Sequence, residues 1–163
     1  MERIIKRIGL FIISIWICSC VTLRPATSIK NGKLENYKYI YITPTISLTS
    51  GSGISISGNY FSSSKSVNPS DVITGIFTKN GFIKLPELKS ELAEETLIIN
   101  YGESGKRYTG LGAYTIEVTI QFVSPQTNSI ICSCTAEGYG STESDGIRKA
   151  ITRCINELTT KIK

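Results

Sequence analysis

Cysteine is the most chemically reactive residue type in this chain, whose 163 residues include five cysteines and no histidine. Three of them, Cys132, Cys134 and Cys154, lie in the C-terminal third. Their spacing places Cys132 and Cys134 on one face of a strand, and Cys154 on the apolar stripe of a predicted final helix. Two interpretations are open: a disulfide from Cys154 to one of the others, or three buried reduced thiols, the slightly favoured state. A zinc site lacks a fourth ligand, so no metal is predicted.

Enzymatic chemistry has little support in the sequence. The absence of histidine excludes the commonest general base and the usual Ser/His and Cys/His nucleophile pairs. No Gly-x-Ser-x-Gly elbow, phosphate loop or dinucleotide fingerprint is present. Asp71 and Asp145 fall in predicted first turns of helices, where a structural role explains both. We therefore predict a non-catalytic protein without a cofactor, and a hydrolase that uses Ser or Lys is the enzymatic alternative.

The first 20 residues have the features of an export signal. Arg3, Lys6 and Arg7 precede an apolar run over residues 8–17 that is too short to span a bilayer. The segment Ile17-Cys18-Ser19-Cys20 then resembles a bacterial lipobox, with small Ser19 before the cysteine that receives the lipid. This resemblance implies a signal peptide at residues 1–19 and palmitate-type lipidation of Cys20. The alternatives are an ordinary secretory peptide cut near Ala26 and a retained anchor.

The residues after Cys20 carry information on location. No acidic residue follows directly, which by resemblance to Gram-negative lipoproteins implies the outer membrane, with the periplasmic side favoured over the cell surface. Removal of residues 1–19 leaves 15 basic and 12 acidic residues, which lowers the net charge from +5 to +3. The basic residues form no block with interleaved aromatics, so nucleic acid is not a predicted partner.

The remaining sequence predicts a tether and one domain. Residues 20–36 are polar and read as the lipidated cysteine and its tether, and residues 37–163 form the domain. A strand rich in β-branched and aromatic residues is predicted at 37–43. Residues 45–66 are rich in Ser, Thr and Gly yet keep a period of two, which predicts a hairpin that turns at Ser50–Gly53. A flexible loop is the alternative for this segment.

The C-terminal two thirds contain two predicted helices and three predicted strands. Asn68 caps the first helix, which ends at Asn80-Gly81. Strands follow at 96–101, 113–123 and 129–137, with a glycine-rich loop at 102–112. Gly138-Tyr139-Gly140 is expected to break the last strand before the final helix. The prediction is an α+β domain with a mostly antiparallel four-stranded sheet and two helices packed on one face.

This element order, together with Cys20 and the hairpin that leads through Gly138-Tyr139-Gly140 to a terminal helix, resembles small bacterial envelope lipoproteins. The N-terminal domain of TolB and the curli secretion lipoprotein CsgG share the layout, which here covers residues 37–162. The resemblance implies a non-catalytic outer-membrane lipoprotein that binds or helps assemble another envelope component. By analogy with CsgG, the alternative is a subunit of an oligomeric secretion pore. The candidate partner-binding residues are Ile54, Ile56, Tyr60 and Phe61 on the hairpin, and Lys106 and Arg107 in the glycine-rich loop.

Overall fold

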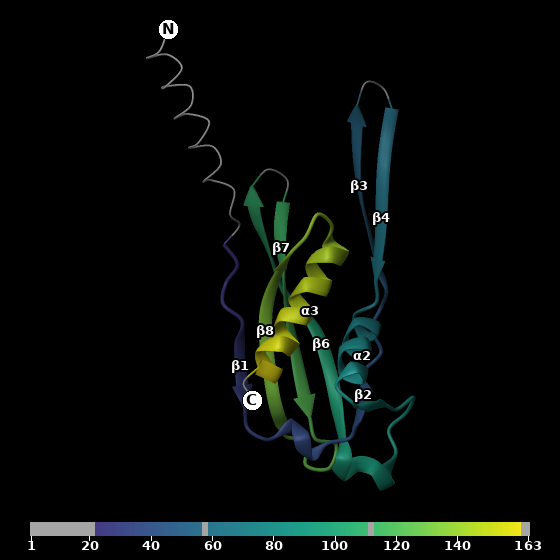
Figure 1. The fold of residues 1–163 in the computed structure, drawn as a ribbon, viewed down its shortest axis with the longest axis vertical. Coiled ribbons are helices and arrows are strands. Elements are labelled where there is room, and N and C mark those ends of the chain that lie inside the picture. The colour runs from purple at the N-terminus through teal and green to yellow at the C-terminus, as the bar shows by residue number, and fades with distance from the viewer. Residues whose placement is uncertain (1–21, 57–58, 111–112, 161–163) are drawn as a thin grey trace.

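A computed structural model describes residues 22–56, 59–110 and 113–160, and it has the predicted α+β class (Figure 1). Six strands form one sheet in the order β1-β8-β7-β6-β2-β5, and β3 and β4 form a separate two-stranded sheet. In chain order the elements are β1 (Thr27–Lys30), the 3-10 helix η1 (Leu34–Asn36), β2 (Tyr39–Ile42), β3 (Leu48–Ile56), β4 (Asn59–Val67), α2 (Pro69–Lys79), β5 (Ile83–Lys84), the 3-10 helix η2 (Ser90–Glu95), β6 (Thr96–Gly110), β7 (Ala113–Val123), β8 (Ile130–Tyr139) and α3 (Glu143–Thr160).

The predicted strand count of four is wrong because two short strands extend the sheet at its edges. β1 pairs antiparallel with β8, and the two-residue β5 pairs parallel with β2, which itself pairs parallel with β6. Neither segment is long enough to show a hydrophobic period in the sequence. β1 also corrects the prediction of a free tether over residues 20–36, since Thr27–Lys30 belongs to the sheet and Leu34 is buried in the core.

Both helices pack on one face of the large sheet, as predicted (Figure 1). α2 begins after Asn68, whose side chain accepts a hydrogen bond from the Ser70 backbone N–H at 3.1 Å. On β7 every second side chain faces the helices and is fully or almost fully buried, which is the period that predicts this strand. The buried core residues of β7 and α3 are Ile116, Val118, Ile120, Phe122, Ile147, Ala150, Ile151, Cys154, Ile155 and Leu158.

β8 continues through Gly138 and ends at Tyr139, so the expected break comes at Gly140 and not at Gly138. Both glycines also allow α3 to approach the strand. A Cβ on Gly138 would overlap the carbonyl oxygen of Gly146 and the backbone nitrogen of Ala150, and a Cβ on Gly140 would lie 2.5 Å from the Gly146 nitrogen. Their role is therefore close packing of helix on strand.

The predicted loop at 102–112 is mostly strand. β6 extends to Gly110 and pairs with β7 as far as Gly110 opposite Ala113, with a register shift between Glu103 and Gly105. Glycine is tolerated in this strand because the shift marks a bulge. The predicted turn at Ser50–Gly53 is also wrong, since these residues lie inside β3. The hairpin itself is confirmed by the pairing of β3 with β4, which reaches Ile56 opposite Asn59, and residues 57 and 58 lie outside the described residues.

The base of the β3–β4 hairpin is fixed to the first turn of α3. The Ser144 backbone N–H donates to Ser50 Oγ at 2.9 Å, and Ser144 Oγ donates to the Lys65 carbonyl at 2.8 Å. Lys65 Nζ also forms an ion pair with Asp145 at 2.8 Å. Beyond this attachment, the hairpin projects past the body of the domain (Figure 1).

Candidate functional site

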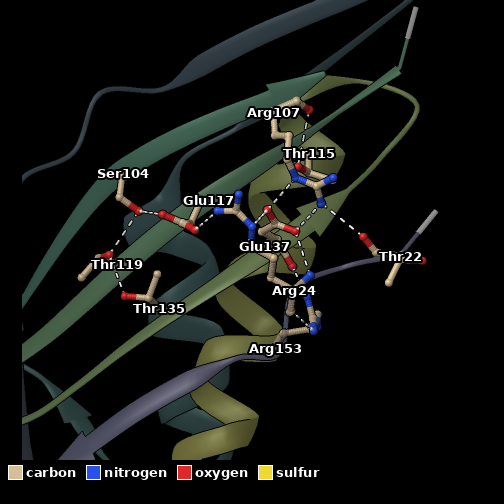
Figure 2. A network of polar contacts seen from close by, with 10 residues as sticks. All are labelled: Thr22, Arg24, Ser104, Arg107, Thr115, Glu117, Thr119, Thr135, Glu137 and Arg153. Atoms are coloured by element: carbon tan, nitrogen blue, oxygen red, sulfur yellow. Dashed lines mark hydrogen bonds and ion pairs between the residues drawn. The ribbon is translucent and has the colours of Figure 1, made fainter. Parts of the chain in front are cut away.

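A buried carboxylate, Glu137 on β8, is the centre of the most connected polar network among the described residues. Its side chain is only 2% exposed although it lies on the sheet face away from the helices. Arg107 on β6 binds it with two hydrogen bonds, from Nε to Oε1 at 3.1 Å and from Nη2 to Oε2 at 2.8 Å. This two-point geometry is the strongest arrangement that a carboxylate and a guanidinium form. Figure 2 shows that the Arg107 side chain crosses β7 near Thr115 to reach Glu137.

The charges of this pair stabilise each other. The hydrogen bonds from Arg107 hold the pKa of Glu137 below its usual value, and the backbone N–H of Arg24 adds to this effect against the cost of burial. The hydrogen bond that Arg107 donates to Glu137 likewise raises the pKa of Arg107. Glu137 is therefore ionised at neutral pH and suited to hold cationic groups and backbone N–H donors, rather than to transfer protons.

The partners of Glu137 include the beginning of the described chain. The backbone N–H of Arg24 donates to Glu137 Oε2 at 2.9 Å, and Arg107 Nη2 donates to the Thr22 carbonyl at 3.1 Å. Arg153 on α3 donates to the carbonyls of both Arg24, at 3.1 Å, and Glu137. These five residues are called the Glu137 cluster below (Figure 2). The cluster binds the chain from Thr22 onward to the sheet, only two residues after Cys20.

A second layer of polar contacts supports the cluster. Arg24 Nη1 lies 3.7 Å from Glu117 Oε2, and Ser104 Oγ donates to Glu117 Oε1 at 2.9 Å. Thr119 bonds both to Ser104 and, at 2.9 Å, to Thr135 on β8 (Figure 2). Side chains of β6, β7 and β8 therefore hold Glu117 and Glu137 on the same face as the N-terminal segment.

The rest of this face, called the uncovered face below, has no helix from the described part of the chain packed on it (Figure 1). Its side chains alternate with the buried core positions. One register row is formed by Tyr41, Ile98 and Val123, and a neighbouring row by Asn100, Gln121 and Ser133. All six are partly exposed. The face therefore has apolar groups at one end and amide and hydroxyl groups beside them.

The three C-terminal cysteines meet between β8 and α3. Cys134 and Cys154 form a disulfide with a Cα–Cα distance of 5.5 Å, in place of the favoured state of three reduced thiols. Cys132 is a free, buried thiol, and desolvation raises its pKa to about 12. A thiol of that pKa is almost entirely protonated at neutral pH and is a poor nucleophile.

The other predicted site residues lie away from the Glu137 cluster or outside the description. Lys106 contacts Glu143 at 3.7 Å and lies over the Tyr114 ring at 4.0 Å, so both basic residues of the predicted loop make internal contacts on β6. The hairpin residues Ile54, Ile56, Tyr60 and Phe61 are placed by backbone register only, and their side chains lie outside the description. Cys20 also lies outside the described residues.

The central residue, Glu137, is absent from the sequence-based candidates. One signal was available: an acidic residue between Ala136 and Gly138 in a predicted strand needs a cationic partner if it is buried. The identity of that partner was not available, because Arg107 is 30 residues away and Arg24 is 113 residues away.

The described residues show neither a metal-ligand cluster nor a membrane-spanning helix. No group of three or more Cys, Asp or Glu side chains in this part of the chain is placed to hold a metal ion. Neither described α-helix is both long and apolar enough to cross a membrane.

Comparison with known proteins gives a likeness in fold. No family model and no curated protein matches the sequence. A PelC variant from Paraburkholderia phytofirmans, solved as a dodecamer, aligns with a TM-score of 0.50 and 11% identity over 82% of this chain and 95% of that one. Protein XCC0632 from Xanthomonas campestris aligns with a TM-score of 0.36 and 14% identity over 86% of this chain and 89% of that chain. At 11% identity, this chain is similar to PelC in fold alone.

Proposed function

We propose that the chain is a non-catalytic lipoprotein of the outer membrane, anchored through Cys20, that binds or helps assemble another envelope component. The observation that supports this proposal most is the Glu137 cluster, which binds the chain at Thr22 and Arg24. Two residues span at most about 7 Å. A lipid on Cys20 would therefore hold the domain directly at the bilayer surface, and each buried CH2 of that lipid would contribute about 0.8 kcal/mol.

Lipidation is tested with two cysteine variants of the full-length chain expressed in a Gram-negative host. The mature protein should incorporate labelled palmitate and carry its acyl groups on Cys20 in a mass spectrum. Cys20→Ser should abolish the label, whereas Cys18→Ser is the matched control and should keep it. Palmitate incorporation in Cys20→Ser, or an unmodified N-terminus near residue 26 in the unaltered chain, would contradict the proposal.

The outer-membrane assignment depends on the residues that follow Cys20. Separation of inner and outer membranes on a density gradient should place the unaltered protein in the outer membrane. Val21→Asp puts an acidic residue directly after the lipidated cysteine and should shift the protein to the inner membrane. Equal distribution of both forms would contradict the assignment.

The uncovered face is the best-supported surface for the partner. It is partly exposed and lies opposite the helices, so that a partner can pack on it without disturbing the core. A photo-crosslinking residue at Gln121 or Ser133 should capture a discrete envelope component in living cells. The matched controls are Arg148 and Lys149, which are exposed on α3. Capture of the same component from both faces, or only from α3, would contradict this placement.

A subunit of an oligomeric envelope secretion pore is the second candidate. It is favoured by the similarity in fold to PelC, which was solved as a dodecamer, together with the projecting β3–β4 hairpin. The size of the detergent-solubilised protein, measured by light scattering, separates the two candidates. A ring-shaped oligomer supports the pore, and a monomer that still captures its partner supports the binding role. Turnover in esterase, peptidase or glycosidase screens would instead contradict both.

A further inference from the structure

Strand β6 has one edge that no other described strand covers along most of its length. On one side it pairs with β7 almost throughout, whereas on the other side its pairing with β2 ends at Ile99. In the described part of the chain, β7 and β2 are its only neighbours in the sheet. The residues from Gly102 to Lys106 are all exposed. The backbone of Gly102–Arg107 on this side, called the β6 edge below, is therefore accessible to another strand.

Two hydrogen bonds show which residues of the β6 edge direct their backbone groups outward. The Ile99 carbonyl accepts a hydrogen bond of 3.0 Å from the backbone N–H of the residue after β2, so Ile99 points away from β7. Alternate residues of a strand point to the same edge, so Glu103 points outward as well. The Arg107 carbonyl accepts from Thr115 Oγ1 on β7 at 3.5 Å, so its neighbour Lys106 points outward.

The bulge in β6 gives Glu103 and Lys106 the same orientation. Residues three apart in a regular strand point to opposite edges, but the register shift between Glu103 and Gly105 adds one residue. Both side chains also lie on the face that the helices cover. Glu103 is on the same side as Ile99, which belongs to the core. Lys106 lies 3.7 Å from Glu143 on α3.

This arrangement makes the β6 edge complementary to itself. If two such edges run antiparallel about a two-fold axis between Ser104 and Gly105, Glu103 of each copy lies opposite Lys106 of the other. Opposite charges at paired positions attract, and both residues can exchange the two hydrogen bonds of an antiparallel pair. A shift of one residue would set outward-pointing groups against inward-pointing ones.

Charges and bulges on an edge strand commonly prevent pairing between molecules. An edge with one sign of charge repels its copy, and a bulge commonly interrupts the regular ladder. In the β6 edge the two charges are opposite in sign and lie at symmetric positions. The bulge lies at the centre and brings both charged residues into register. The same two features therefore favour one specific pairing here.

We propose that two copies of this chain associate through their β6 edges, so that their six-stranded sheets join into one continuous sheet. The two-fold axis would stand perpendicular to the sheet, and both uncovered faces would lie on the same side as one surface for the partner. The association extends the binding role proposed above, because a closed pair leaves no β6 edge for the growth of a ring. A short edge forms a small interface, so we expect a dissociation constant in the micromolar range.

Charge reversal tests the register. The full-length chain is purified in detergent, and its dissociation constant is measured by sedimentation velocity over the micromolar range. Glu103→Lys and Lys106→Glu each place like charges opposite one another at both symmetric positions, and each should weaken the association about tenfold. Lys149→Glu is the matched control, because Lys149 is exposed on α3 away from the β6 edge, and it should leave the constant unchanged. Circular dichroism confirms the folding of each variant.

Mixing the two reversed variants separates this interface from a general loss of stability. In a mixed pair, a lysine of one copy lies opposite a glutamate of the other at both positions, so the mixture should regain the association of the unaltered chain. A mixture as weak as its components would overturn the proposal. So would an unaltered chain that stays monomeric, or a larger ring that resists both reversals. These outcomes leave the tests of lipidation and of partner capture at Gln121 unaffected.

Hydrogen exchange provides a second test that needs no substitution. The backbone N–H groups of Glu103 and Lys106 should exchange several-fold more slowly in concentrated than in dilute unaltered protein, because only a second copy can accept their hydrogen bonds. The backbone N–H of Arg107, which points toward β7, is the internal control and should exchange at the same rate at both concentrations. Exchange at Glu103 and Lys106 that does not depend on concentration would overturn the proposal.

Discussion

Arg107 binds Glu137 across an intervening strand, with two hydrogen bonds of 3.1 and 2.8 Å from β6 to β8. The same guanidinium reaches the Thr22 carbonyl, so one side chain joins three segments of the chain. The Glu137 side chain is 2% exposed and the Arg107 side chain is 37% exposed. If the pair were broken, water could hydrate the guanidinium, whereas the carboxylate would stay buried without its main cationic partner. Glu137 therefore holds the N-terminal segment both directly, through the Arg24 backbone N–H, and through Arg107.

Replacement of this carboxylate should loosen the N-terminal segment. Glu137→Gln keeps the shape but removes the charge, and we expect a loss of about 1–3 kcal/mol in the free energy of unfolding, measured by urea denaturation. The Arg24 backbone N–H, which donates to Glu137, should also exchange with solvent faster than in the unaltered protein. The matched control is Glu117→Gln, whose contact with Arg24 is 3.7 Å long and partly exposed, and its effect should stay below about 1 kcal/mol. Equal effects of the two substitutions would contradict the central role of Glu137.

The cluster should also make stability depend on pH in the acidic range. The folded-state pKa of Glu137 lies below its ordinary value of 4.5 because Arg107 stabilises the carboxylate. A carboxyl with a lowered pKa contributes its full stability above the unfolded pKa and loses it as the pH falls through the folded pKa. The pKa of Asp145 is also lowered, because its carboxylate accepts hydrogen bonds from Lys65 and Ser141. Urea denaturation between about pH 7 and pH 3 should therefore show stability falling below about pH 4.5.

Glu137→Gln provides the control for this pH effect. This variant should lose less stability than the unaltered protein as the pH falls, and the loss that remains should come from protonation of Asp145 and the other carboxyl groups. A decline of unchanged size in Glu137→Gln would show that another group is responsible.

Reduction of the disulfide should destabilise the domain. Cys134 and Cys154 are separated by 20 residues, and a loop of this length is worth about 3 kcal/mol in the chain-entropy account. Adding a reductant should lower the denaturation midpoint of the unaltered protein, and the double variant Cys134→Ala/Cys154→Ala should not respond to it. Cys132→Ala is the matched control and should remain sensitive to reductant. Three alkylated thiols in the unreduced, denatured mature protein would contradict the disulfide.

Close packing of α3 on β8 predicts strong sensitivity at Gly138. The added methyl of Gly138→Ala would overlap backbone atoms of Gly146 and Ala150, which cannot rotate away as a side chain can. We expect a loss of about 1–3 kcal/mol or more, measured as a lower thermal midpoint. Gly102→Ala is the control, because a Cβ there meets nothing within 4 Å, and its effect should be within about 0.5 kcal/mol. Similar losses at both positions would contradict this account.

The sequence by itself determined the elements with clear local signals. The period of two in residues 113–123, the apolar stripe of residues 147–158 and the Asn68-Pro69 start predict β7, α3 and α2, because burial on one face imposes these patterns. The same reasoning placed Cys132, Cys134 and Cys154 on facing elements. It left open which of them pair, since that choice depends on the helix position over the strand.

Only the tertiary structure decided the features that depend on long-range pairing. β1 and β5 are too short to carry a period, and the glycines of β6 indicate a loop until β7 is beside them. Gly138 and Gly140 read as strand breakers for the same reason, because a local sequence does not show which backbone approaches from across the sheet. The Glu137 cluster brings together residues from both ends of the chain. A buried carboxylate requires cationic or N–H partners, but only the fold determines that these are Arg107 and the backbone of Arg24.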